Sequence, residues 1–341
     1  MKQKTKSVQM AVVIIRASIV IVTIMVTALT NNPAAAMNFP SMTRDLVLRD
    51  DSPEEPYYPA NKPFYEVPLS LVPHDHFLLS RPISDETLTW RTSDYRYGYL
   101  IKKEGNVHGG LDIPAPERTP VLAVGDGVVV FSGYGLLYGE GARNDPYGIA
   151  VMIRHDKDYD GMVIYTVYTH LNQAIVKKND TVKTGQKIGG VGMTGNTSGP
   201  HLHFEVRIRD EHGVTFQNPE LWLVPPLDHG VLAGRIINNL GYLLNNWNIR
   251  LTSLDTGNEW QIRTYDISII EEYQHDPYYQ ENFVINDLPA GRYELFTYYN
   301  SVAYKYEFEL VPGAVNFIEF LGKQGFNHGD PPGSRNTNFL N

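Results

Sequence analysis

Five side chains able to bind a metal or move a proton fall in three short motifs. They are His108 and Asp112 in His-Gly-Gly-Leu-Asp, His170 in Tyr-Thr-His-Leu, and His201 and His203 in His-Leu-His. Alternate side chains of a β-strand share a face, so the last two imidazoles should line one cleft. His and Asp are ligands that zinc accepts when cysteine is absent, and a catalytic zinc has three protein ligands with one open position. Five groups therefore suffice for three ligands and two histidines that transfer protons or stabilise a transition state.

Each motif alone is a weak signal. A His-X-His pair is often a surface feature, and a histidine at the end of a strand is often a packing residue. The three motifs occur within one block of about 100 residues, and each has glycine or proline nearby that allows close approach of the backbone. Their joint occurrence favours one functional cluster.

The block that carries these motifs reads as short β-strands separated by glycine. Between residues 77 and 224 apolar runs alternate with turn signals, and no long helical pattern is present. Pro225-Pro226 ends the block, because two successive prolines remove backbone donors and fix an extended conformation. The prediction is an all-β core with strands at Val121 to Phe131, Ile149 to Arg154, Met162 to Thr169, Lys187 to Val191 and Leu202 to Ile208.

Composition excludes several classes of function. The 341 residues contain 29 Lys and Arg against 38 Asp and Glu, a formal net charge of −9. An acidic chain has no footprint for nucleic acid, since phosphate binding requires clustered basic residues. The absence of cysteine excludes disulfides, thiolate metal sites, cysteine nucleophiles and lipid attachment to an N-terminal cysteine.

The N-terminus has the pattern of an export signal over residues 1–36. Three lysines precede an apolar stretch, and Ala34-Ala35-Ala36 follows, so cleavage is expected after Ala36. The alternative is an uncleaved membrane anchor over Met10 to Leu29, a length close to a membrane span. Residues 37–69 are rich in proline and acidic residues, and we expect an extended linker.

An extended stretch of sequence resembles the M23, or lysostaphin- and LytM-like, zinc endopeptidases that cut peptide cross-links of peptidoglycan. About 150 residues carry the resemblance. Its motifs are Phe77-Leu78-Leu79-Ser80-Arg81-Pro82, Tyr95-Arg96-Tyr97-Gly98, His108-Gly109-Gly110-Leu111-Asp112-Ile113, Pro120 to Val129, Tyr168-Thr169-His170-Leu171, Val182 to Gly189, and Thr194 to Val206.

The resemblance implies a role for each of the five side chains. His108, Asp112 and His203 would be the zinc ligands, and His170 and His201 the catalytic pair. One of this pair would take the proton of the zinc-bound water; we assign that role to His170, with His201 as the alternative. Members of the family often carry an upstream tyrosine that donates to the oxyanion, for which Tyr97 and Tyr99 are candidates.

Other features of this block are interpreted separately. The glycine-rich stretch from Tyr134 to Tyr147 departs from the family pattern and is predicted to form a wall of the substrate groove, with a tolerated surface insertion as the alternative. His155 is interpreted as a turn residue, and His74 and His76 as surface residues.

Residues 227–322 form a second strand-rich block with turn signals at short spacing, predicted to be a small antiparallel β-sandwich. Its Gly-Arg-Ile and Leu-Pro-Ala-Gly-Arg-Tyr runs resemble carboxypeptidase regulatory-like, transthyretin-related domains. Such a domain would bind wall glycan or a protein partner, or act as a spacer, which is the reading we favour. The expected organisation is signal peptide 1–36, linker 37–69, peptidase domain 70–226, β-sandwich 227–322 and disordered tail 323–341.

The sequence thus predicts an exported, zinc-dependent peptidoglycan endopeptidase. Two alternatives stay open: a non-catalytic LytM-like module that binds wall or activates another enzyme, and a metallopeptidase of this fold that acts on a secreted protein. The membrane would be a partner only if the leader is uncleaved.

Overall fold

The computed structural model describes residues 65–72, 74–83, 96–101, 106–265, 267 and 270–335. The expected signal peptide, its alternative as an anchor, and the linker up to residue 64 lie outside these residues. Among the helices that the structure describes, none has the length and apolar character needed to cross a membrane.

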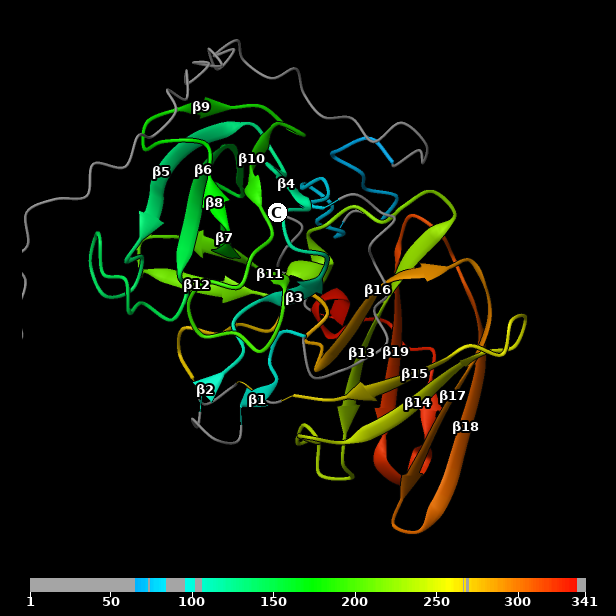
Figure 1. Cartoon of the computed structure of the whole chain (residues 1–341). Helices are drawn as coiled ribbons and strands as arrows, with labels where there is room; N and C mark the ends of the chain where they lie inside the picture. The colour runs from blue at the N-terminus through cyan, green and yellow to red at the C-terminus, as the bar shows by residue number, and fades with distance from the viewer. Residues whose placement is uncertain are drawn as a thin grey trace, which may run out of the picture. The chain divides into compact units, whose positions relative to one another are not determined.

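The first half of the described chain is built on a seven-stranded sheet (Figure 1). Its order is β12-β11-β7-β6-β5-β9, and β3 pairs with β11 as well. The strands are β3 (Leu111–Pro114), β5 (Gly127–Tyr134), β6 (Ile149–Tyr159), β7 (Met162–Leu171), β9 (Thr181–Val182), β11 (His201–Arg209) and β12 (Val214–Gln217).

Smaller elements complete this half. A three-stranded sheet has the order β4-β10-β8, and β1 pairs with β2. The predicted strand Val121 to Phe131 is two strands, β4 and β5, because residues 123–126 leave the extended pattern between them. The elements are β1 (Leu100–Ile101), β2 (Asn106–Val107), β4 (Pro120–Leu122), β8 (Gln173–Ala174), β10 (Lys187–Gly190) and the 3₁₀ helix η3 (Pro219–Leu221).

Strand β11 is the element that brings the motifs together. On one side His203 pairs with Asp112 of β3, and on the other side it pairs with Thr169 of β7. His170 follows Thr169 directly. Two antiparallel pairings therefore bring Asp112 and Thr169, which precede His203 by about 90 and about 30 residues, next to β11.

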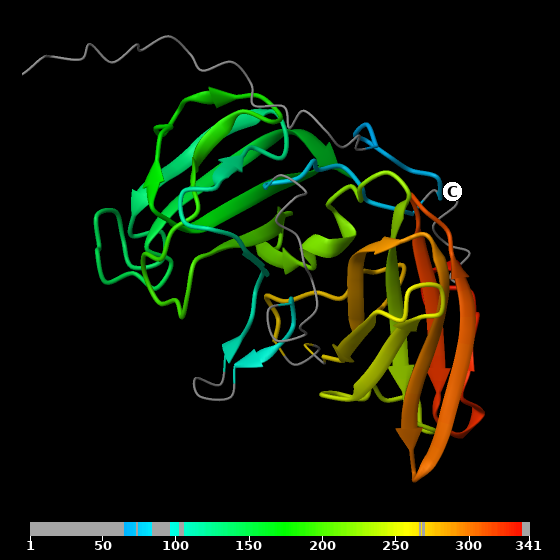
Figure 2. The ribbon, with the colours of Figure 1, turned by 45° about the vertical axis from the view of Figure 1, so that its right-hand side comes forward.

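The second half contains two four-stranded sheets, β16-β13-β19-β20 and β15-β14-β17-β18 (Figure 2). Both contribute to one apolar core, in which Leu232 and Ile318 of the first sheet meet Ile249 and Leu295 of the second. The strands are β13 (His229–Ile237), β14 (Asn248–Ser253), β15 (Glu259–Arg263), β16 (Phe283–Pro289), β17 (Gly291–Tyr299), β18 (Val302–Leu310), β19 (Val315–Leu321) and β20 (Phe326–Asn327).

The all-β prediction is confirmed, with two differences in the second half. Strands β13 and β19 pair in parallel, so the sandwich is not purely antiparallel. The sheet extends past Lys323, because η4 (Gly322–Gln324) leads into β20, which pairs with β19, and η5 (Pro332–Arg335) follows. The expected disordered tail therefore does not begin at Lys323.

The two halves share buried side chains. All described residues belong to one compact unit, Pro53–Asn341, and the larger apolar core includes Phe77 and Trp222 together with Val231, Val284 and Phe317. The predicted domain limits at 70 and 226 remain predictions. The strands before and after Pro225-Pro226 share this apolar core.

A segment of the second half also extends the first sheet at the edge strand β12. Phe216 makes a parallel bridge with Tyr273, its N–H donates to the Glu272 carbonyl at 2.7 Å, and its carbonyl accepts from the Gln274 N–H at 3.1 Å. The edge of the sheet that carries β11 is thereby covered by residues 272–274.

Candidate metal centre

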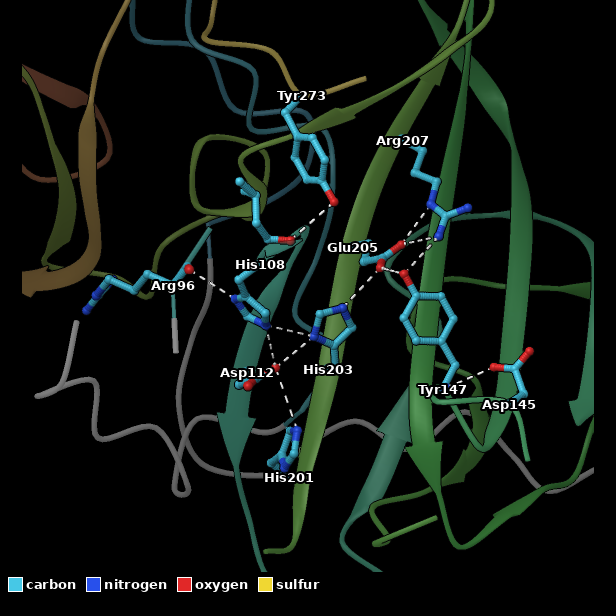
Figure 3. A network of polar contacts seen from close by, with 11 residues as sticks. Arg96, His108, Asp112, Asp145, Tyr147, His201, His203, Glu205, Arg207 and Tyr273 are labelled. Atoms are coloured by element: carbon cyan, nitrogen blue, oxygen red, sulfur yellow. Dashed lines mark hydrogen bonds and ion pairs between the residues drawn. The ribbon is translucent and has the colours of Figure 1, made fainter. Parts of the chain in front are cut away.

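Three of the five predicted side chains converge on one point (Figure 3). His108 Nε2 lies 3.0 Å from Asp112 Oδ1 and 3.0 Å from His203 Nδ1, and His203 Nδ1 lies 2.7 Å from Asp112 Oδ1. Within the described residues these three form the group whose donor atoms could hold a metal ion. The side chains retain slight exposure, 10% for His108, 14% for Asp112 and 7% for His203, so the site opens to solvent.

The outer hydrogen bonds of both imidazoles turn lone pairs toward that point. His108 Nδ1 lies 2.9 Å from the Arg96 carbonyl, and His203 Nε2 lies 3.0 Å from Glu205 Oε1. An acceptor at one ring nitrogen holds the proton there and leaves the other nitrogen free for a metal. Two imidazole nitrogens and a carboxylate oxygen then face each other, and a positive charge between them, a proton or a metal ion, stabilises the arrangement. This donor set fits a zinc ion.

The charged groups around the centre also favour a cation. Burial alone would raise the pKa of Asp112, but His108 and His203 hold it well below its ordinary value. Burial alone would lower the pKa of His203, but the hydrogen bonds and charges of Asp112 and Glu205 raise it to about 9. Two carboxylates thus create a field that favours positive charge between them.

His170 and His201 lie beside the three converging side chains. Their rings are 4.8 Å apart, and His201 Nε2 lies 3.6 Å from Asp112 Oδ1. His170 Nδ1 lies 2.8 Å from the Thr194 carbonyl, and His201 Nδ1 lies 2.9 Å from the Gly199 carbonyl. Each ring therefore keeps Nε2 free, with its proton on Nδ1. Burial, and then the charges of His203 and His201, lower the pKa of His170 to about 4, so His170 is neutral at neutral pH.

The backbone at His170 is strained. Its φ of 59° lies in the left-handed region that non-glycine residues seldom adopt. The N–H of His170 donates to the Tyr147 carbonyl at 2.9 Å, and the neighbouring Gly148 approaches Thr194 so closely that a Cβ would lie 2.4 Å from the Thr194 backbone. Strain of this kind persists where surrounding contacts fix it, and it gathers at functional sites.

A second layer of side chains holds Glu205, and sequence reasoning missed it. Arg207 contacts Glu205 Oε2 at 2.6 and 2.7 Å, and the Tyr147 hydroxyl donates to Glu205 Oε1. Burial alone would raise the pKa of Glu205, but Arg207 and then His203 lower it to about 2. The period of two that pairs His201 with His203 also puts Glu205 and Arg207 on that face, so this signal was available.

The glycine-rich stretch before Tyr147 is an ordered loop. Asp145, only 1% exposed, accepts the N–H groups of Leu137 and Tyr138 with Oδ2 and that of Tyr147 with Oδ1, at 2.7 to 2.9 Å. Leu137 and Tyr138 are 49% and 63% exposed at its tip. The loop therefore anchors Tyr147 at the metal centre and presents apolar side chains to solvent.

Of the two tyrosines predicted as oxyanion donors, Tyr97 has its hydroxyl engaged elsewhere. The Tyr97 hydroxyl donates to the Phe216 carbonyl at 2.8 Å and accepts from the Gln274 N–H at 3.1 Å, and the residue is 1% exposed. The guanidinium of Arg263 lies over the Tyr99 ring. Tyr97 is a packing residue beside the centre, and its hydroxyl is occupied by backbone groups.

Two further histidines differ from their interpretation as turn and surface residues. His155 lies within β6 and is 6% exposed, with Nε2 2.8 Å from Thr166 Oγ1. His76 is 4% exposed, with Nε2 2.6 Å from Asp276 Oδ2. Both belong to the interior, because each has a buried polar partner that the local sequence does not reveal. His74 is half-buried and stacks on Tyr278.

Comparison with known families places the centre within a recognised domain. Residues 106–215 match the family described as peptidase family M23. These residues include His108, Asp112, His170, His201 and His203.

Curated relatives match over a similar stretch. The chain is 40% identical over 143 residues to "DD-carboxypeptidase/endopeptidase Mpg" of Neisseria meningitidis, covering 40% of this chain and 30% of that protein. It is also 40% identical over 124 residues to "Peptidoglycan DD-endopeptidase ShyA" of Vibrio cholerae, covering 35% and 25%. The chain thus spans less than a third of the length of these relatives.

Among solved structures, the catalytic domain of the antimicrobial peptidase lysostaphin from Staphylococcus simulans is 32% identical. That match covers 37% of this chain and 86% of that chain, with a TM-score of 0.30.

Proposed function

Because the chain carries a peptidase family M23 domain at residues 106–215, we propose that it is a zinc-dependent endopeptidase that hydrolyses peptide cross-links of peptidoglycan. The observation that carries the proposal is the convergence of His108 Nε2, Asp112 Oδ1 and His203 Nδ1, with both imidazoles oriented by outer acceptors. The printed names of the two relatives, a DD-carboxypeptidase/endopeptidase and a peptidoglycan DD-endopeptidase, support the substrate class.

We assign the roles of the five side chains from their positions. His108, Asp112 and His203 would hold the ion, which supplies Lewis-acid polarisation of the scissile carbonyl and activation of water when it is bound. His170, neutral and with Nε2 free, accepts a proton as general base. His201, whose Nε2 faces Asp112 at 3.6 Å, would stabilise developing negative charge at the edge of the site when that nitrogen carries a proton.

Glu205 holds the proton on His203 Nε2, and Arg207 and Tyr147 hold Glu205. This chain of contacts orients the third ligand before substrate arrives. Preorganisation of this kind avoids reorganisation during the reaction and is worth about 10- to 100-fold in metal affinity or activity.

We assign the loop from Tyr134 to Tyr147 as a wall of the substrate groove. Its base is fixed at the metal centre through Tyr147, and its tip exposes Leu137 and Tyr138. Deleting Leu136 to Asn144 should lower the cleavage rate or change the preference among cross-links. If neither changes, the loop is a surface insertion.

We further propose that the protein acts outside the cytoplasm, since the leader has the basic, apolar and small-residue order of an export signal. Detection of the mature protein with Met37 as its first residue, by mass spectrometry of the exported fraction, tests this. A full-length protein retained in the membrane would instead indicate the anchor.

The test of the activity is release of new amino groups from purified peptidoglycan by the full chain, with zinc, with chelator, and with the variant His201→Ala. Chelator-sensitive release that is lost in the variant, while bound zinc stays stoichiometric, is the expected result. Bound zinc without release would favour a protein substrate, and neither zinc nor release would favour a binding module. Equal loss of zinc in His201→Ala and Asp112→Ala would contradict the division into ligands and catalytic pair.

A further inference from the structure

We propose that Tyr273, which belongs to the C-terminal half, is a positioning residue of the metal centre and acts by fixing the backbone on both sides of His108. This inference rests on the proposed function, because it takes His108, Asp112 and His203 as the zinc ligands. It assigns the C-terminal half a part in the active site, where the sequence favours a spacer.

The first contact lies before His108. The Tyr273 hydroxyl donates to the carbonyl of Val107 at 3.2 Å, and Figure 3 shows this side chain directed at the backbone next to His108. Val107 is 9% exposed, so its carbonyl has little access to water as an alternative partner. A buried carbonyl without a donor is costly, and the hydroxyl satisfies it only in this backbone position.

The second contact lies after His108. The ring of Tyr273 stacks on Phe216, with centroids 4.8 Å apart and 13° between the planes. The pair covers Gly109, where an added Cβ would lie 3.1 Å from Phe216 and 3.3 Å from Tyr273. Because Gly109 has no side chain, the two rings pack directly on the backbone of the His-Gly-Gly-Leu-Asp motif.

Backbone hydrogen bonds to β12 of the seven-stranded sheet fix the position of Tyr273. Glu272 and Gln274, its neighbours on either side, bond to the N–H and carbonyl of Phe216 at 2.7 and 3.1 Å. The Tyr97 hydroxyl joins β12 to the same segment by donating to Phe216 and accepting from Gln274. Tyr273 therefore approaches His108 from a rigid support.

The backbone N–H and the imidazole of His108 are themselves held by hydrogen bonds, so a shift of the backbone cannot be offset by a rotation of the ring. Its N–H donates to the Tyr99 carbonyl at 2.8 Å and its Nδ1 faces the Arg96 carbonyl at 2.9 Å. The imidazole direction is thus set by the path of residues 107–109 relative to residues 96–99. Holding Val107 and Gly109 fixes that path, and the Nε2 lone pair with it.

The test compares the zinc affinity of the full-length wild type with that of Tyr273→Phe, by competition with a chromogenic chelator. The substitution removes the hydroxyl and keeps the ring stacked on Phe216. Zinc should bind about fivefold more weakly, the loss expected when one neutral hydrogen bond is removed. The zinc concentration for half-maximal release of amino groups from peptidoglycan should rise by the same factor, and added zinc should restore the rate.

The matched control is Tyr304→Phe, which also removes a tyrosine hydroxyl bonded to a backbone carbonyl, that of Lys323 at 3.3 Å, within the C-terminal half. Its zinc affinity should equal that of the wild type. All chains are compared at a temperature at which circular dichroism shows the metal-free proteins folded, so loss of fold is separated from loss of affinity.

Zinc affinity of Tyr273→Phe within twofold of the wild type overturns the proposal. A lower rate at saturating zinc with unchanged affinity also overturns it, because Tyr273 would then act on substrate. If the wild type releases no amino groups, the proposed function fails, while the zinc titration still decides the role of Tyr273.

Discussion

Two buried clusters of histidine and carboxylate in this protein have opposite designs. In the metal-centre cluster (His108, Asp112, His170, His201 and His203), ring nitrogens of His108 and His203 converge on one oxygen of Asp112. In the junction cluster (Asp75, His76, Asp276, Tyr279 and Glu281), where the two halves of the chain meet, protein donors occupy the carboxylates. Asp75 accepts from the Tyr279 hydroxyl at 2.5 Å, and Glu281 accepts from the Tyr265 hydroxyl at 2.7 Å.

The difference shows that proximity of histidine to carboxylate does not define a metal site. His76 and Asp276 are closer together, at 2.6 Å, than His108 and Asp112. Asp276 also accepts the N–H groups of Tyr278 and Tyr279 at its other oxygen. An acid whose oxygens accept from backbone and tyrosine donors supports the fold, whereas an acid shared by two imidazoles that outer acceptors orient is suited to a cation.

The largest effect is expected for loss of an acid from each cluster. Asp112→Ala removes a ligand and should weaken zinc binding by more than the ~100-fold that loss of an outer partner costs. Asp75→Ala in the junction cluster should leave zinc affinity within twofold of the wild type. Chelator competition on both full-length variants measures this, and similar losses in the two would erase the distinction between the clusters.

The same Asp75→Ala variant should lose fold stability instead. It leaves the Tyr279 hydroxyl and the Val315 N–H, which now contact Asp75 at 2.5 and 3.3 Å, buried without acceptors. A decrease of about 2 to 3 kcal/mol in the free energy of unfolding is expected from unsatisfied buried donors. Urea unfolding of the metal-free proteins tests this, with the wild type as reference. An unchanged midpoint would mean that the cluster adds nothing to stability.

An intermediate effect is expected from replacing one outer acid in each cluster by its amide. Glu205→Gln weakens the acceptor that orients His203, so zinc affinity should fall about 10-fold. Glu281→Gln is the matched control, a fully buried carboxylate in the junction cluster, and should change zinc affinity less than twofold. If Glu205→Gln binds zinc as the wild type does, the contacts of Tyr147 and Arg207 with Glu205 do not tune the centre.

The smallest effect at neutral pH concerns His155, a buried histidine that belongs to neither cluster. Burial lowers its pKa to about 4 against an ordinary 6.5. Between these two pH values His155 is protonated in the unfolded chain and neutral in the folded chain. Its contribution to stability is complete above pH 6.5 and is lost as the pH falls toward 4, by about 1.4 kcal/mol per pH unit. His155→Gln should flatten that part of the curve of unfolding free energy against pH. A curve of unchanged slope would show that His155 titrates normally.

The sequence predicted the residues that converge at the candidate centre because they lie in motifs with local geometry. His201 and His203 share a face through the strand period, and His108 precedes Asp112 by four residues across a glycine pair. Glu205 obeys the same period and could have been included. These residues need only one strand, β11, and its two neighbours to come together.

The contacts that the sequence did not predict depend on distant parts of the chain. His76 reads as a surface residue because its partner Asp276 is 200 residues away. Tyr273 reaches Val107 across 166 residues, and no periodicity of β-strands encodes that meeting. Likewise, the hydroxyl of Tyr97 is engaged by Phe216 and Gln274, so its local position in a family motif could not reveal its direction.

The apolar core shared by the two halves has a consequence for how the protein unfolds. Arg81 forms a two-point ion pair with Asp287 at 2.5 and 2.8 Å, and Trp222 packs in the same core as Val231 and Phe317. Each half would expose part of that core if the other unfolded, so neither has a stable separate state to visit. Heat should therefore melt both halves in one cooperative transition, with calorimetric and van't Hoff enthalpies that agree.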